Sequence, residues 1–600
     1  MKRALSLILV LLLCAGLMAG CSSSPANVPA DDQTVSDAPS APAENKAPAE
    51  EPAEAPAEEP ADEPAGAPVD EPTAEPTEEP VEAPAEEPAE EEYYMVKGFA
   101  ENTIGYPICE DGEITLTMWH MTYPQILERK GEPMGENFVM PELEKRTGIN
   151  VEYVVNSYFT YDQQMSLAIV AEDYPDMAHH IGYAGGLEQA IEDEVTIDLA
   201  PYLETYAPNY LRWIEMTEAN HKAAYTDTGR VTGFAQCYNH PQNSWLGYGV
   251  RQNWMDELGL EMPTTTDEWH DVLLTFKESK TGGEPPLDIQ KDGFTPGNFI
   301  EGAFNIDGAK ELSMIQKNDV IETSYRSEGL RQYLEMMHSW FAEGLIDRDF
   351  VSLEGFFNAT RMANNWSGIV PVMYTQAGSY VSDTNMAEAG TYMTLMPYVE
   401  VEGIERNIYN KGKYSAGMGS GGAVIFDTCE HKEEAIRWFD YRYSEEGYML
   451  TNYGIQGVTF DFDENGQPYQ LELLTNNPDG LNIGDAMECY LLNGGAGIFW
   501  LEREEAAAND EGRRYNELWS ASGDWNLTGT LSYTAEEGEA RGTKATDIET
   551  YASEFICKVI MGDIELNDST WAEFQDTLTA MGIDEVIEIA QTAYNRFLER

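Results

Sequence analysis

The chain has 600 residues, of which 107 are acidic and 35 are basic, giving a formal net charge of −72. This charge argues against nucleic acids and anionic membrane surfaces as partners, and it weakens the case for an anionic ligand, because like charges repel. The length exceeds what one hydrophobic core usually serves, so at least two lobes are expected.

The first 20 residues have the composition of an export signal. Lys2 and Arg3 precede an apolar run over residues 4–19, which is too short for a spanning helix but suits the hydrophobic region of a signal peptide. Residues 17–21, LMAGC, resemble a lipobox, in which small residues admit the peptidase and a cysteine thiol receives diacylglycerol. We predict a signal peptide over 1–20 and a lipid anchor on Cys21, at the extracellular face of the cell membrane. Simple cleavage is the alternative.

Residues 21–92 are rich in Pro, Ala and Glu and contain near repeats such as EPAE, with almost no large apolar side chain. Such a segment cannot bury a core, and its prolines favour extended structure. We predict a semi-rigid tether that reaches at most about 220 Å. The segment 22–92 carries a formal charge of −21, which leaves −53 for residues 93–600.

The cysteines after the tether are five in number, widely spaced and without a C-x-x-C pair: Cys109, Cys237, Cys429, Cys489 and Cys557. This pattern supports neither a zinc site nor a disulfide scaffold.

Strand and helix patterns alternate at the start of residues 93–600, which we call the body. Residues 113–120 and 149–155 read as strands, with a helix between them that ends near residue 148. A helix over 163–172 is followed by a third expected strand over 177–183. This alternation predicts an α/β lobe with a parallel sheet.

The clearest helix begins after Thr265, which forms a capping box with Glu268, and its apolar positions recur at helical spacing. Further amphipathic helices are expected over 330–343 and 432–443, with a buried strand over 368–374 between them.

Six phrases in order resemble family 1 extracellular solute-binding proteins, in particular the large sugar and alginate-type lipoprotein branch of ABC transporters. They lie at 165–176 (MSLAIVAEDYPD), 197–210 (IDLAPYLETYAPNY), 227–233 (DTGRVTG), 250–269 (VRQNWMDELGLEMPTTTDEW), 340–350 (WFAEGLIDRDF) and 443–458 (YSEEGYMLTNYGIQGV).

The resemblance implies a type II periplasmic-binding-protein fold, in which two discontinuous α/β lobes are joined by a hinge and hold the ligand in the cleft between them. We expect lobe 1 to comprise 93–248 and 414–455, and lobe 2 to comprise 249–413 and 456–600. Closure around a ligand would then be a hinge motion.

Ligands of parallel α/β sheets bind beyond the carboxyl ends of the strands, and aromatic side chains suit the apolar faces of sugar rings. These rules favour residues after the first and third strands, near the hinge, beside the buried strand and after a Gly-rich segment; for each, core packing is the alternative. The candidate ligand-binding residues are Trp119, His120, Tyr123, Tyr183, Tyr238, Trp245, Trp366, Tyr374 and Trp500. His240 and Asn243 lie in the same irregular segment as Trp245.

Residues 415–422, SAGMGSGG, lack the lysine of a phosphate-binding loop, so a tight hinge turn is expected there. Residues 461–472 satisfy the EF-hand pattern, with candidate calcium ligands at Asp461, Asp463, Asn465 and Glu472. Pro468 occupies a normally apolar position, so an Asn-Gly hairpin is the simpler interpretation. Apart from this possible calcium, no cofactor is expected.

The resemblance implies capture of a carbohydrate, in particular an oligosaccharide, by a monomer that delivers it to an ABC permease. The alternatives are peptide binding or sensing on the same scaffold, and a surface glycosidase, which needs two carboxylates across a cleft. No H-E-x-x-H, G-x-S-x-G or Cys/His signature supports an enzyme.

Overall fold

The computed structural model divides into two units, residues 1–86 and 87–600, and the second is described here. The predicted signal peptide, Cys21 and the tether lie outside the described residues, as do Tyr123, His240, Asn243 and Asn465. The described residues are 99, 104–110, 112–122, 137–158, 160–183, 185–238, 244–353, 359–374, 392–412, 418–464, 466–479, 481, 483–492, 495–500, 503, 512, 514, 518–527 and 531–600.

Lobe 1 is built on a six-stranded sheet in the order β14-β4-β11-β3-β1-β2. β11 runs antiparallel to both of its neighbours, and the other five strands are parallel to one another. The carboxyl ends of those five strands therefore meet at one border of the sheet, which we call the carboxyl edge. The strands are β1 (Ile114–Thr122), β2 (Ile149–Ser157), β3 (Met177–Ala178), β4 (Phe234–Tyr238), β11 (Met418–Ile425) and β14 (Gly497–Phe499).

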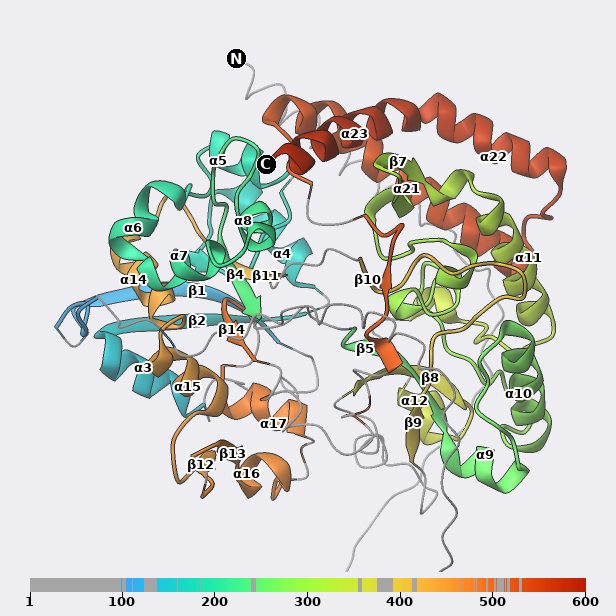
Figure 1. Ribbon diagram of the computed structural model, residues 1–600, viewed down its shortest axis with the longest axis horizontal. Coiled ribbons are helices and arrows are strands. Elements are labelled where there is room, and N and C mark those ends of the chain that lie inside the picture. Colours follow the sequence, from blue (N-terminus) through green and yellow to red (C-terminus); the bar gives the residue numbers. More distant parts are fainter. Residues whose placement is uncertain are drawn as a thin grey trace, which may run out of the picture. The chain divides into compact units, whose positions relative to one another are not determined.

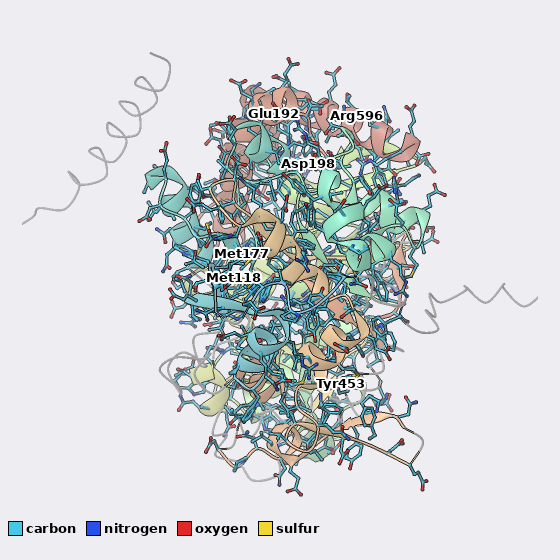
Figure 2. All side chains as sticks on the ribbon, turned by 90° about the vertical axis from the view of Figure 1, so that its left-hand side faces the viewer. Met118, Met177, Glu192, Asp198, Tyr453 and Arg596 are labelled. Atoms are coloured by element: carbon cyan, nitrogen blue, oxygen red, sulfur yellow. The ribbon has the colours of Figure 1, made fainter. Side chains whose placement is uncertain are left out.

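Alternation along β1 directs Leu116, Met118, His120 and Thr122 to one buried face, and Met118 pairs with Met177 of β3 (Figure 2). That face is covered by α3 (Val139–Thr147), α7 (Pro208–Ile214), α14 (Lys432–Tyr441), α15 (Glu445–Tyr453) and α17 (Ile483–Tyr490). The opposite face packs a smaller cluster with α4 (Tyr161–Ala171) and α5 (Leu187–Glu192). Figure 1 shows α3 and α15 on one side of β1 and β2, and α5 on the other.

Lobe 2 contains a three-stranded antiparallel sheet in the order β8-β5-β9, with every residue of the central strand buried. A Cβ at Gly247 of this strand would lie 2.5 Å from the Trp519 ring, so only glycine permits this packing. The principal elements are β5 (Leu246–Arg251), β8 (Ile369–Met373), β9 (Met393–Leu395), α10 (Thr266–Ser279), α11 (Glu328–Ala342), α21 (Ala535–Met561), α22 (Asp568–Met581) and α23 (Ile583–Glu599). They share one hydrophobic core.

Shorter elements complete the two lobes. They are α6 (Leu203–Tyr206), α8 (Glu218–Ala224), α9 (Gln252–Leu258), α12 (Ala359–Ala363), α16 (Glu472–Thr475), β6 (Met314–Lys317), β7 (Val320–Thr323), β10 (Lys411–Gly412), β12 (Phe460–Phe462), β13 (Pro468–Gln470) and β15 (Ser522–Gly523). Within the described part of the chain, no helix has both the length and the apolar character that a bilayer span requires. None of the five cysteines of residues 93–600 forms a disulfide with another described residue, and four of them are buried.

The segments in which the chain crosses between the lobes differ in part from the expected lobe boundaries. The chain enters lobe 2 between β4 and β5, so the expected boundary after residue 248 falls within β5, and it returns between β10 and β11. The last crossing was expected near residues 454–458, but β14 pairs with β4, and Phe460, Leu474 and Ile498 are buried in the lobe 1 core. The segment 460–499 therefore belongs to lobe 1, and the chain crosses between β14 and β15.

The Gly-rich segment also differs from its prediction, because residues 418–425 form strand β11 and not a hinge turn. A Cβ at Gly422 would lie 2.2 Å from the Phe234 carbonyl oxygen, and a Cβ at Gly233 would lie 2.6 Å from the Ala423 oxygen. The pairing register shifts between Gly419 and Gly422. These glycines allow two backbones to approach closely at a β-bulge.

The capping box predicted for α10 is confirmed: the Thr265 side chain accepts a hydrogen bond from the Glu268 amide at 3.2 Å, and the Glu268 carboxylate accepts one from the Thr265 amide at 3.1 Å. We expect Thr265→Ala to lower the free energy of unfolding by about 1 kcal/mol, because an N-terminal amide of the helix loses its partner. Urea denaturation monitored by circular dichroism measures this change. Thr275→Ala is the control, since that hydroxyl bonds only the Asp271 carbonyl within the helix; an equal loss there would contradict the role of the cap.

Candidate functional site

Two histidines and a tyrosine lie together at the carboxyl edge of the lobe 1 sheet. The ring centroids of His120, in β1, and His179, directly after β3, are 4.3 Å apart. The Tyr153 ring, in β2, lies 6.0 Å from the His120 ring. His120 and His179 are only 4% and 5% exposed, so the neighbouring strands β3, β1 and β2 place polar side chains in a site that bulk water hardly reaches.

Two helices add ionisable groups to these rings. Glu488 of α17 places its Oε1 atom 4.0 Å from His120 Nε2, and the same oxygen accepts a hydrogen bond of 3.1 Å from the Thr122 hydroxyl. Arg442, directly after α14, is 1% exposed and acts electrostatically on both His120 and Tyr153. We call these side chains the polar cluster: His120, Tyr153, His179, Arg442 and Glu488.

Hydrogen bonds from neighbouring helices fix the elements around the polar cluster. Asn137, just before α3, donates to the Leu491 carbonyl at 2.6 Å and so holds the end of α17. Asn452 of α15 donates to the Ile498 carbonyl at 2.9 Å and holds β14. Gly495, before β14, faces the ring of His179, since a Cβ there would lie 3.2 Å from Nε2. The site is therefore formed by segments from both halves of lobe 1.

Burial keeps most of the polar cluster uncharged. It lowers the pKa of His120 to about 4, with a further contribution from the nearby Arg442 charge, and it lowers the pKa of His179 well below its usual value. Burial also raises the pKa of Glu488 to about 7, although the Thr122 hydrogen bond opposes this rise. At neutral pH both imidazoles are neutral and the Glu488 carboxyl is close to its titration midpoint.

Several buried atoms of the polar cluster have hydrogen-bonding capacity left. Among the described residues, His120 Nδ1, His179 Nδ1 and the Tyr153 hydroxyl have no hydrogen-bond partner. Buried polar atoms are usually paired, and exceptions are concentrated at functional sites. Neutral donors and acceptors of this kind suit the hydroxyl groups of an uncharged ligand.

Trp119 lies on the opposite face of β1 from His120, because successive strand residues point to opposite faces. It is half-buried, and its ring makes an edge contact with Tyr161 at 6.3 Å between centroids. Sequence reasoning treated Trp119 and His120 as neighbours in one site, but the strand separates their side chains. Sequence reasoning also missed Tyr153, Arg442 and Glu488, whose local patterns are those of ordinary strand and helix residues.

The other predicted ligand residues are distributed over both lobes. Tyr183 is half-buried and donates to Asp193, while Tyr238 is buried beside Phe499 in lobe 1. Trp500 stacks on Phe99 at 5.4 Å and contacts Tyr448, which favours the core-packing alternative for this residue. In lobe 2, Tyr374 is buried, Trp366 is half-buried and Trp245 is 37% exposed beside the crossing from β4. Ligand contact by these residues stays a prediction.

The EF-hand-like segment forms a hairpin in which β12 pairs with β13. Gly466 has a φ of 77°, and the Asp463 carboxylate accepts from the Gln467 amide at 2.8 Å, while Asp461 accepts from Gln456 and from the Phe462 amide. Glu472 is the first residue of α16. The carboxylates thus bond groups of their own hairpin, and the described residues contain no group of three or more acidic, His or Cys side chains arranged for a metal. This geometry matches the hairpin alternative, and we do not propose a calcium site.

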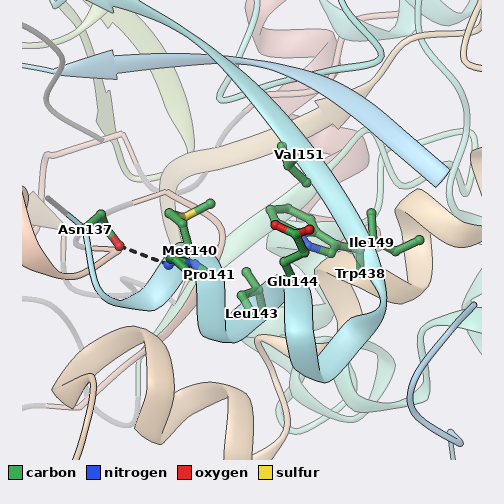
Figure 3. A pocket seen from close by; sticks show the side chains of 8 residues that line it. All are labelled: Asn137, Met140, Pro141, Leu143, Glu144, Ile149, Val151 and Trp438. Atoms are coloured by element: carbon green, nitrogen blue, oxygen red, sulfur yellow. Dashed lines mark hydrogen bonds between the residues drawn. The ribbon is translucent and has the colours of Figure 1, made fainter. Parts of the chain in front are cut away.

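A small cavity of about 150 Å³ lies between α3, β2 and Trp438 of α14 (Figure 3). Its lining includes Ile149 and Val151 at the amino end of β2, so it lies away from the carboxyl edge. We assign it no part in the polar cluster.

A family model described as "Bacterial extracellular solute-binding protein" matches residues 135–449, more than half of the chain. The chain belongs to this family. A second model, "PT disordered repeat", matches residues 51–86 within the predicted tether.

Curated relatives of this solute-binding protein include the fructooligosaccharide ABC transporter substrate-binding protein FusA of Streptococcus pneumoniae. It is 21% identical over 365 residues, which cover 57% of this chain and 63% of FusA. The polygalacturonan/rhamnogalacturonan-binding protein YtcQ of Bacillus subtilis is 21% identical over 335 residues, covering 54% of this chain and 63% of YtcQ. The chain thus spans less than two thirds of the length of these two relatives.

Solved structures show the same fold. The alginate-binding protein AlgQ2 without calcium superposes with a TM-score of 0.66 at 19% identity, covering 81% of this chain and 99% of AlgQ2. FusA of S. pneumoniae in complex with kestose gives a TM-score of 0.65 at 17% identity, with coverage of 81% and 99%. The predicted two-lobed α/β fold of solute-binding proteins is therefore confirmed.

The raised pKa of Glu488 makes stability depend on pH. Because the folded pKa of about 7 lies above the ordinary value of 4.5, the folded state binds the proton more tightly, and stability is lost as pH rises from 4.5 to 7. Between pH 4.5 and 7 the parent should lose about 3 kcal/mol of unfolding free energy through this group, and Glu488→Gln should abolish that loss. The stability difference between variant and parent, measured by urea denaturation at several pH values, should therefore grow in favour of the variant up to pH 7. A difference for Glu488→Gln that stays constant with pH would contradict the raised pKa of this carboxyl.

Proposed function

We propose that the protein captures an uncharged oligosaccharide between its two lobes and delivers it to the membrane permease of an ABC importer. The observation that carries this proposal is the polar cluster, a set of buried and mostly uncharged donors and acceptors at the carboxyl edge of a solute-binding fold. Ligands of open α/β sheets bind beyond this edge. The names of similar proteins support a carbohydrate, since FusA is named for fructooligosaccharides and AlgQ2 for alginate.

The charge of the body favours a neutral ligand over a polyuronate. Residues 93–600 carry a formal charge of −53, which repels a polyanion at long range. A neutral imidazole can both donate and accept hydrogen bonds, as sugar hydroxyl groups do. The partly buried Trp119 ring, beside Tyr161, supplies an apolar surface near the same edge. The family and the similar structures are binding proteins, and we propose no catalytic role for this chain.

We further propose that the mature protein is a monomer held at the extracellular face of the cell membrane by a lipid on Cys21. The lipobox-like residues 17–21 support this proposal, and a similar protein from B. subtilis is named lipoprotein LipO. The segment 21–92 would then separate the lobes from the membrane. We expect Cys21→Ser to move the protein from the membrane fraction to the medium, because a lipid chain is needed for stable anchoring. Cell fractionation and immunoblotting measure this change, and retention of the variant in the membrane fraction would count against the lipid.

The ligand class is tested with the chain from residue 22 onward, prepared without lipid. We expect kestose or nystose to raise its melting temperature, whereas an oligogalacturonate and short peptides should leave it unchanged. A ligand at 100 times its Kd stabilises the folded state by about 2.7 kcal/mol. A shift with peptides alone would reject the carbohydrate, and a shift with the oligogalacturonate would reject the preference for neutral ligands.

The site is tested by calorimetry on the sugar that binds. We expect Trp119→Ala and His120→Ala each to weaken binding by about tenfold or more, since each removes a ring from the carboxyl edge. Trp571→Ala is the matched control, because this partly buried ring packs on Phe574 within lobe 2. Equal affinity in all three variants would place the ligand elsewhere.

A further inference from the structure

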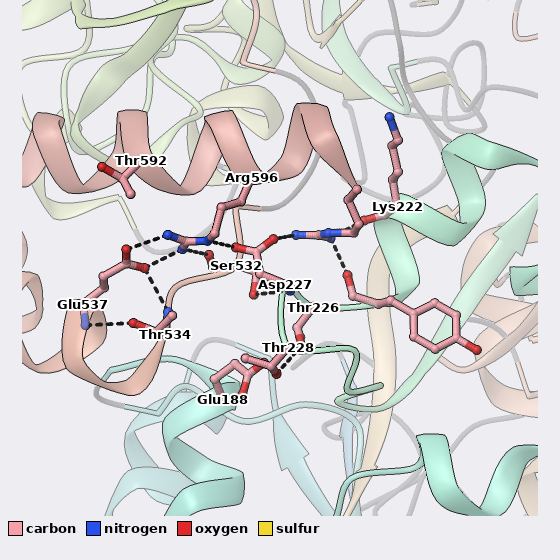
Figure 4. Close-up of polar contacts among 12 residues, drawn as sticks. Glu188, Lys222, Thr226, Asp227, Thr228, Ser532, Thr534, Glu537, Thr592 and Arg596 are labelled. Carbon is pink, nitrogen blue, oxygen red and sulfur yellow. Dashed lines mark hydrogen bonds and ion pairs between the residues drawn. The ribbon is translucent and has the colours of Figure 1, made fainter.

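An ion-pair cluster joins the two lobes outside the segments in which the chain crosses between them. Asp227 of lobe 1 accepts from Arg596 Nε at 2.6 Å, and its other oxygen is bonded by the guanidinium of Arg600 (Figure 4). Arg596 also donates to Glu537 of lobe 2, with 2.7 Å between Nη1 and Oε1. We call these four residues the interlobe clasp. One carboxylate of lobe 1 thus binds two arginines of lobe 2.

Local structure holds each charge of the interlobe clasp in place. Asp227 lies in a turn closed by the hydrogen bond from the Thr226 amide to the Arg230 carbonyl at 2.9 Å. Glu537 belongs to the capping box of α21, in which its carboxylate accepts from the Thr534 amide at 3.0 Å. The first bond holds the backbone around Asp227 and the second holds the Glu537 carboxylate, which lowers the entropic cost of the ion pairs.

Burial makes these ion pairs stronger than ordinary surface pairs. The Asp227 side chain is 5% exposed and that of Arg600 is 11% exposed. Salt screens such pairs less than exposed ones, and breaking them would leave a carboxylate and a guanidinium without their partners in a poorly solvated site.

Backbone contacts accompany the charges. Arg600 donates to the Lys222 carbonyl of α8 at 2.6 Å, and its guanidinium also bonds the Tyr225 carbonyl. Close by, Gly538 of α21 packs against the loop before α5, where a Cβ would lie 2.3 Å from the Gly185 oxygen. The two lobes therefore meet along a preformed surface and not through long flexible side chains alone.

The interlobe clasp is separate from the polar cluster. The turn that holds Asp227 leads into the amino end of β4, whereas the polar cluster lies at the carboxyl edge, where β4 ends. Figure 2 shows Arg596 toward the top of the view, away from Met118 and Met177 of the central strands. The interlobe clasp can thus act on the arrangement of the lobes without contacting a ligand at the carboxyl edge.

We propose that the interlobe clasp is a conformational restraint, which limits the range of angles that the two lobes sample in the absence of ligand. A change in the angle between the lobes moves Asp227 relative to α23, and so stretches both ion pairs at once. Both lobes belong to a body with a formal charge of −53, and their mutual repulsion acts against any close arrangement. Two cations of lobe 2 bound to one anion of lobe 1 oppose that repulsion locally.

The test measures the distance between the lobes in the ligand-free mature chain. Labels are attached at Lys145→Cys in lobe 1 and Asp271→Cys in lobe 2, whose native side chains are 74% and 86% exposed, with Cys109 replaced by Ser. Single-molecule energy transfer or pulsed electron resonance then gives the distribution of distances. We expect Asp227→Asn to raise, by about tenfold, the fraction of molecules whose distance between the labels lies outside the main peak. Asp227→Arg should raise this fraction further, because the new side chain repels both arginines.

The matched control is Glu585→Gln, which removes the ion pair between Lys544 of α21 and Glu585 of α23 within lobe 2 and leaves the interlobe clasp intact. A distribution unchanged by both Asp227 variants, each shown to be folded by circular dichroism, would overturn the proposal. Equal broadening in Glu585→Gln would also overturn it, because the effect would then reflect the stability of lobe 2. No ligand is present in this measurement, so a failed sugar assay and a failed restraint are distinguishable.

Discussion

The pairing of β11 with β3 and β4 is the constraint on which the architecture depends. The lobe 1 sheet is complete only when the chain returns from lobe 2 and inserts this strand between two strands made more than 180 residues earlier. Gly233 and Gly422 permit the approach, since a side chain at either position would collide with the facing backbone. Each lobe is therefore discontinuous in sequence, and the segments that join them arise from the folding of lobe 1 itself.

The same sheet brings the polar cluster together. Because β1, β2 and β3 are parallel, residues from three separate strands reach one edge, and α17 and the residue after α14 complete the site from the second part of lobe 1. Removing these groups from water costs free energy, and their shifted pKa values express that cost. A structural core would place apolar side chains there. The retention of neutral polar groups at this edge is what a hydroxyl-rich ligand requires.

The carboxyl edge and the interlobe clasp differ in how their side chains are charged. At the carboxyl edge the two imidazoles are neutral and the Arg442 guanidinium is buried beside them, although the body around this edge is strongly acidic. The interlobe clasp concentrates charge of both signs in a small, partly buried region, where ion pairs have directional geometry and resist screening. The candidate ligand site thus relies mainly on neutral polar groups, whereas the contact between the lobes relies on ion pairs.

The sequence by itself determined the local elements and the family. The spacing of apolar residues along the sequence predicted β1, β2, α10 and α14 close to their observed bounds. The capping box was predicted with both of its residues, Thr265 and Glu268. These features depend on neighbours a few residues apart, so a single chain segment contains the whole signal. The order of six phrases indicated the solute-binding family, which the family model confirms.

Only the tertiary structure decided which lobe receives the segment 460–499 and which polar residues meet. Nothing local in α17 or β14 indicates that they pack in lobe 1, since an amphipathic helix can bury its apolar face against either core. Trp119 and His120 are neighbours in sequence but face opposite sides of β1, whereas Glu488 is 368 positions from His120 and lies beside it. Long-range contacts of this kind follow from strand order and helix packing, which the periodicity of a single chain does not contain.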